Sequence, residues 1–167
     1  MKHLFRASFL LALLAFVPVG LVSAGTQPRL VLVVAKGSPI VDISRADLKQ
    51  VFLSETTVVN GHKVVPFNFE NKAAQRVAFD QVVLGMSVDE IGRFWVDRKI
   101  RGQRPAPRAV PSAAYMTKLV QVFPGALGYL SETELPANIQ PVMIGGLSYK
   151  DPHYPLSQPL DRSVSVF

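Results

Sequence analysis

The sequence predicts one α/β domain with a mostly parallel β-sheet flanked by helices. Residues Leu30–Ala35 (LVLVVA) form an uninterrupted apolar run, which is typical of a strand buried on both faces of a parallel sheet. β-Rich runs then alternate with segments of helical periodicity, as they do in domains built from strand–helix–strand units. The chain of 167 residues is also long enough to bury a substantial core.

The N-terminus has the features of a cleaved signal peptide. Lys2 and Arg6 precede a long apolar stretch, and Val22–Ala24 fits the small-residue rule for cleavage. Pro18 interrupts the apolar stretch, which favours cleavage over the alternative, an uncleaved membrane anchor. We therefore expect export to a bacterial periplasm. The expected organisation is a signal peptide at 1–24, a folded domain at 25–146 and an extended C-terminal tail at 147–167.

Helices are predicted from apolar periodicity and from residues that favour helix starts. Ser44 with Asp47, and Ser87 with Glu90, match the pattern in which a capping hydroxyl is followed three residues later by a carboxylate. Asn71 is a further candidate cap. The expected helices follow Ser44, run over Lys72–Leu84 and Val88–Arg98, and follow Ser112 as far as Pro124-Gly125.

Strands are predicted where β-branched and aromatic residues gather between turn signals. Asn60-Gly61 separates two such runs and is the strongest short signal for a β-hairpin. The remaining strands are expected at Leu30–Ala35, Val64–Phe69, Ala126–Leu130 and Ile139–Ile144, with a last one at Ser163–Phe167.

Residue types that usually carry catalysis are scarce. The absence of cysteine excludes a thiol nucleophile, disulfides and a lipid-modified cysteine after the leader. Beyond the leader, the histidines are His62 in the hairpin turn and His153 in the tail, where neither would be held rigidly as a base. No His, Asp or Glu pair has metal-ligand spacing. We expect no enzyme, metal or cofactor, and no nucleic-acid partner for an exported chain with few scattered aromatic residues.

The strand at Val64–Phe69 leads directly into a helix, an arrangement that often holds anions because free N–H groups and the helix dipole point outward there. The candidate anion ligands are Asn71, Lys72, Ala73, Ala74 and Arg76, with Gly37 and Ser38 from the turn after the first strand. Two observations weigh against a strong site. Glu70 would repel an anion, and Arg76 is spaced for an ordinary ion pair with Asp80 on a solvent-facing side of the helix.

The loop that follows the third helix is strongly basic. Its sequence RKIRGQRPAPR contains four arginines that we take as candidates for docking a partner: Arg98, Arg101, Arg104 and Arg108. Such a loop can attract an anion, an acidic partner or a phospholipid surface. The alternative is a solvated loop without a specific partner.

Several phrases of the chain resemble one lobe of the periplasmic phosphate-binding proteins that serve ABC transporters. They are DISRADLKQVFLSETTVVNGHKVVPF, FDQVVLGMSVDEIGRFW and FPGALGYL, within residues 31–130. The family has a Ser-x-x-x-Leu-x-x-Ile-Phe-x-Gly helix and a Pro-Gly-Ala-Ile-Gly-Tyr turn. Here the helix motif begins at Ser44, the turn is Pro124–Tyr129, and Ser54 stands in place of the glycine of the first motif.

The resemblance implies a single lobe of a type II periplasmic binding protein, because full-size members close two lobes around the ligand. It implies phosphate or another small oxyanion as ligand and an ABC transporter as partner. The family's phosphate loop carries arginine followed by Gly-Ser-Gly-Thr, whereas the matching stretch here is Glu70–Ala74. We therefore expect weak or degenerate anion binding, with a homodimer able to supply a second wall. The alternative is a ligand-free adaptor that docks a partner through its basic loop.

Overall fold

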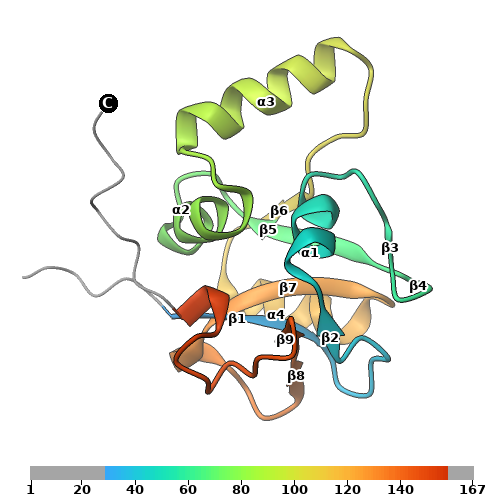
Figure 1. Ribbon diagram of the computed structural model, residues 1–167, viewed down its shortest axis with the longest axis vertical. Helices are drawn as coiled ribbons and strands as arrows, with labels where there is room; N and C mark the ends of the chain where they lie inside the picture. The colour runs from blue at the N-terminus through green and yellow to red at the C-terminus, as the bar shows by residue number, and fades with distance from the viewer. Residues whose placement is uncertain (1–28, 158–167) are drawn as a thin grey trace, which may run out of the picture.

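The computed structural model describes residues 29–157, which form one mixed α/β fold around a five-stranded sheet (Figure 1). The strand order across the sheet is β6-β5-β7-β1-β8. The five strands are β1 (Leu30–Ala35), β5 (Val65–Phe69), β6 (Arg108–Val110), β7 (Ala126–Ser131) and β8 (Ile139–Pro141). The α-helices are α1 (Arg45–Phe52), α2 (Ala74–Phe79), α3 (Val88–Ile100) and α4 (Ala113–Val122).

Strand direction confirms the predicted fold class and corrects one detail. β5 pairs in parallel with both β6 and β7, whereas β1 is antiparallel to both β7 and β8. Four strands therefore point the same way, and β1 alone is reversed. The sheet is mostly parallel as expected, but the strand that we predicted to be parallel is the exception.

Helices cover both faces of the sheet, and β7 shows how. Tyr129 stacks on Phe79 of the α2 segment at 4.0 Å and lies 6.1 Å from Phe52 of α1. On the opposite face, Gly128 lies directly beneath Met116 of α4, where an added Cβ would be 2.5 Å from the sulfur. Because neighbouring residues of a strand point to opposite faces, α1 and α2 lie on one side of the sheet and α4 on the other. β1 is buried because α4 and the short helical turn at Pro155–Ser157 pack against it.

The local signals for helix starts and for the hairpin are confirmed. The Ser44 hydroxyl accepts the N–H of Asp47 at the start of α1, and Ser87 with Glu90 forms a complete capping box at the start of α3. Asn60 and Gly61 adopt positive φ between β3 (Val58–Val59) and β4 (His62–Lys63).

Two element boundaries differ from the predictions. The helix expected from Lys72 begins at Ala74, and from Asp80 to Leu84 it continues as a π-helix. The start is later because the Ala73 N–H donates to the Glu70 carbonyl, so the chain first completes a turn out of β5. The strand expected at Ile139–Ile144 is divided into β8 and β9 (Met143–Ile144), and β9 pairs in parallel with β2 (Asp42–Ile43).

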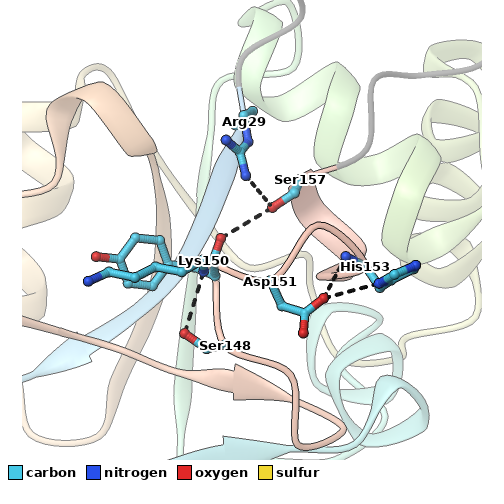
Figure 2. Close-up of polar contacts among 7 residues, drawn as sticks. Arg29, Ser148, Lys150, Asp151, His153 and Ser157 are labelled. Carbon is cyan, nitrogen blue, oxygen red and sulfur yellow. Dashed lines mark hydrogen bonds and ion pairs between the residues drawn. The ribbon is translucent and has the colours of Figure 1, made fainter.

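The segment after residue 146 packs onto the domain as far as the structure describes it. Tyr154 is fully buried, and its hydroxyl accepts the Leu32 N–H and donates to the Val142 carbonyl. Figure 2 shows polar contacts along this segment, including the bond from Arg29, just before β1, to the Ser157 hydroxyl. Residues 147–157 are therefore a packed part of the fold.

Two further expectations lie outside the described residues: the signal peptide at 1–24 and the strand at Ser163–Phe167. Among residues 29–157, none of the helices has the length and apolar character needed to cross a membrane.

Candidate functional site

The turn between β5 and α2 carries the candidate anion site. Asn71 and Lys72 are exposed there, and within residues 29–157 no side chain caps the first turn of α2. The Ala73 N–H is already bonded to the Glu70 carbonyl at 2.9 Å. It is therefore not free for a ligand, contrary to the prediction from the sequence. The open N–H groups at this helix start are therefore those of Ala74, Gln75 and Arg76. Gln75 was not among the predicted ligands, because the helix start predicted at Lys72 lies two residues before the observed start at Ala74.

Arg76 has a different role from a solvent-facing ligand. The predicted pair with Asp80 forms, with Nε 2.6 Å from the carboxylate, but both side chains are almost completely buried. Arg76 Nη1 also donates to the Phe69 carbonyl at the end of β5. The guanidinium thus fastens α2 to β5 beneath the exposed turn, and its charge is largely committed to Asp80.

A buried polar cluster surrounds this ion pair. Asn68 on β5 accepts a hydrogen bond from the Tyr129 hydroxyl. In the described structure the Asn68 Nδ2 has no partner, and neither has one carboxylate oxygen of Asp80. Burial raises the pKa of Asp80, although the Arg76 guanidinium opposes this shift. Burial likewise raises the pKa of Tyr129. The signal for this cluster in the sequence is the amide of Asn68 within the otherwise apolar strand sequence VPFNF. We did not predict the cluster from it.

Gly37 and Ser38 do not join the turn at α2. The register pairs Val34 with Leu127 and Leu127 with Pro66, so the end of β1 is level with the start of β5, with β7 between them. Because β1 runs antiparallel to β5, the carboxyl ends of these two strands lie at opposite ends of the sheet, measured along the strand direction. Gly37 instead donates its N–H to Gln140 of β8, whose amide also donates to the Ser38 carbonyl. The structure therefore places Gly37 and Ser38 apart from the turn at α2, and they are not part of the same candidate site.

Of the first two arginines of the basic loop, Arg98 lies in α3 and Arg101 is the residue that caps its C-terminus. Arg98 is half-buried, with its guanidinium 5.3 Å from the Phe94 ring centre and 5.8 Å from that of Trp95. Arg101 is exposed and pairs with Asp97 one turn earlier at 3.0 Å. Both arginines therefore have partners on their own helix.

The other two arginines, Arg104 and Arg108, line an open groove of about 370 Å³. Its apolar wall comes from the end of α1, the start of β5, the proline-rich loop and α4, and includes Phe67 and Phe123. The Ser54 hydroxyl holds the loop in place by donating to the Pro105 carbonyl at 2.7 Å. Ser54 has a φ of 57°, in the left-handed region that favours glycine. This backbone conformation explains why the family motif has a glycine at the position of Ser54.

Comparisons with solved structures agree with this architecture. An ABC-type phosphate transport receptor from Vibrio cholerae matches with a TM-score of 0.61 and 19% identity, over 80% of this chain and 56% of that one. A Clostridium perfringens protein described as a phosphate ABC transporter substrate-binding protein, with bound phosphate, matches with a TM-score of 0.64 and 19% identity, over 80% and 54%. PstS from Borrelia burgdorferi matches with a TM-score of 0.61 and 12% identity, over 80% and 56%.

The chain therefore has the fold of phosphate-binding transport receptors and spans about half the length of the structures it matches. The resemblance noted in the sequence is confirmed at the level of the fold. No protein-family model matches the sequence, and no curated protein matches it either.

Proposed function

We propose that the protein is a periplasmic solute-binding module related to phosphate and oxyanion uptake, and that it binds anions weakly. The observation that carries the proposal is the fold, which it shares with a receptor described with bound phosphate. The matched proteins are substrate-binding and transport receptors, which favours a non-enzymatic role with an ABC transporter as partner.

The proposed site is the start of α2. An anion would accept hydrogen bonds from the N–H groups of Ala74 and Gln75, with the exposed side chains of Asn71 and Lys72 beside it. The helical segment continues through the π-helix without a break, so its dipole supports a negative charge at this end. Arg76 would contribute indirectly, by fixing α2 against β5.

Weak binding follows from what surrounds these groups. The turn is exposed and lacks the glycines and hydroxyls that let an oxyanion approach the backbone closely. Glu70 adds a negative charge next to the site. A single lobe also leaves one side of the ligand in water, so its charge is only partly desolvated. A second copy of the chain, or another protein, would have to supply the opposite wall.

Calorimetric titration of the purified protein with phosphate at low ionic strength tests the proposal, with sulfate as a second anion. We expect saturable heat that Lys72→Ala abolishes. Lys118→Ala, which removes an exposed positive charge from α4, is the matched control and should bind as the wild type does. No heat up to millimolar phosphate would contradict anion binding, and equal loss in both variants would contradict the location.

The second candidate function is a ligand-free adaptor that docks a partner through the basic loop. The groove lined by Arg104 and Arg108 favours it, because two cations border an apolar surface that a protein partner could cover. In a pull-down from periplasmic extract, Arg104→Glu with Arg108→Glu should abolish capture, and added phosphate should change nothing. Arg93→Glu on α3 is the matched control. Capture that survives the double reversal would exclude this groove.

A further inference from the structure

The outward face of α3 carries an exposed apolar stripe. Val88, Val96 and Ile100 are 43%, 60% and 79% exposed, and together with Gly92 they recur every four residues along the helix. The helix meets the domain through its other face, where Ile91 is buried. Figure 1 shows α3 at one end of the long axis of the molecule, apart from the central sheet. A contiguous exposed apolar stripe of this kind usually marks an interaction surface.

Gly92 lies in the middle of the stripe, and nothing that packs against it within residues 29–157 calls for a glycine. It lies within α3, where glycine is less favourable than every residue except proline. An added Cβ there would meet nothing within 4 Å, so none of its neighbours in the described part of the chain requires a small residue. A glycine becomes useful if a second helix approaches closely at this point, because residues four apart form the ridges along which helices pack.

The charges beside the stripe identify the second helix. Asp89, Arg93, Asp97 and Arg101 follow one another at the same four-residue spacing, with alternating sign. If a second α3 lies antiparallel, Arg93 faces Asp97 of the partner copy and Asp89 faces Arg101 of the partner copy. In a parallel two-fold arrangement the charged rows of the two copies would lie on opposite sides of the interface and would not meet. The pattern is therefore self-complementary only in the antiparallel direction.

We propose that the protein forms a two-fold symmetric homodimer through antiparallel packing of α3 against α3 of a second copy. In this register Val96 packs over Gly92 of the partner copy, and Val88 lies toward Ile100 of the partner copy. The exposed ion pairs set the direction, and burial of the apolar stripe provides most of the affinity. This inference does not depend on the proposed anion binding.

One helix from each copy makes a small interface, below the ~1,600 Å² of a standard one, so we expect a dissociation constant of roughly 10–100 μM. Sedimentation equilibrium over roughly 5–500 μM, a range that extends to both sides of this dissociation constant, should show a concentration-dependent dimer. Val96→Glu should abolish it, whereas Val122→Glu, at an equally exposed valine on α4, should not. A wild-type protein that remains monomeric throughout overturns the proposal.

Gly92→Ala separates this proposal from a purely local role for the helix. Alanine should raise the thermal stability of the monomer because it favours the helix, and it should weaken the dimer at least tenfold because it fills the position that Val96 of the partner copy occupies. Dimerisation as strong as that of the wild type would refute the packing of Val96 over Gly92.

Charge reversal tests the direction. Reversing all four charges together (Asp89→Arg, Arg93→Asp, Asp97→Arg and Arg101→Asp) preserves the alternation, so this variant should still dimerise with itself. It should pair poorly with the wild type, because like charges then face each other. Native mass spectrometry of a mixture should show mainly the two homodimers. A statistical share of heterodimer would refute the antiparallel arrangement.

Discussion

Replacing Gly125 with alanine tests how closely the chain before β7 approaches the hairpin. Gly125 has a φ of 76°, and an added Cβ would lie 2.4 Å from the backbone carbonyl oxygen of Lys63. The Gly125 carbonyl also accepts the Val65 N–H at 2.8 Å, where β5 begins. The substitution therefore acts on the backbone geometry that joins β5 to β7.

The expected loss has two parts. A left-handed conformation costs an alanine about 1–2 kcal/mol, and displacing the Lys63 carbonyl weakens the bond between Val65 and Gly125 by about 1 kcal/mol. Together these give a loss of about 2–3 kcal/mol in the free energy of unfolding. Gly128→Ala is the matched control, because its Cβ would meet the flexible side chain of Met116 at 2.5 Å. Met116 can shift, so that variant should lose only about 1–2 kcal/mol.

Urea unfolding followed by the fluorescence of Trp95, the only tryptophan, measures both losses. A double-mutant cycle between Gly128→Ala and Met116→Ala should show coupling of about 1 kcal/mol. Gly125→Ala should show no coupling to Met116→Ala, since its obstruction is a carbonyl of the backbone. The reasoning fails if Gly125→Ala loses less than about 1 kcal/mol, or less than Gly128→Ala.

Two further predictions concern ionised side chains. Arg76→Met leaves Asp80 buried without its partner, and at neutral pH it should cost about 3–5 kcal/mol. Burial raises the pKa of Asp80 above its ordinary 3.8, so the folded state binds the proton more tightly, and the variant should regain stability as the pH falls toward 3.8. In pH-dependent urea unfolding, no recovery in acid would contradict this account, and adding Asp80→Leu should restore most of the stability at pH 7. At the start of α3, hydrogen bonds from the Ser87 backbone N–H and hydroxyl lower the pKa of Glu90 below 4.5. The stabilisation of α3 by the ionised Glu90 carboxylate is present above pH 4.5 and is lost as the pH falls through the lowered pKa. Glu90→Gln should therefore make the helicity measured by circular dichroism less dependent on pH in that range. An acid profile that the substitution leaves unchanged would argue against the capping box.

The sequence was sufficient where neighbours along the chain decide the structure. The serines at the starts of α1 and α3 bond to residues three positions later, and Asn60-Gly61 turns the hairpin through positive φ. These interactions need no distant partner, so short patterns predict them. The apolar run of β1 likewise predicted burial on both faces, because its composition reflects the helices on either side of the sheet.

The candidate site was only partly predictable. The turn after β5 was identified from the sequence, and the structure places Asn71 and Lys72 at its exposed surface. The spacing of Arg76 and Asp80 predicted their pair but not its burial, which depends on packing against β5 and Tyr129. The helix start also moved, because the turn needed to leave β5 consumed the residues expected to begin α2.

What only the tertiary structure decided was the direction of β1 and, with it, the position of Gly37 and Ser38. An apolar run reads the same in either direction, and the partners of β1 are β7 and β8, about one hundred residues further along the chain. Local sequence therefore determined which segments become strands and helices and where most of them begin. Long-range pairing determined which of their ends meet, because backbone hydrogen bonds between distant strands leave no trace in the pattern of either strand alone.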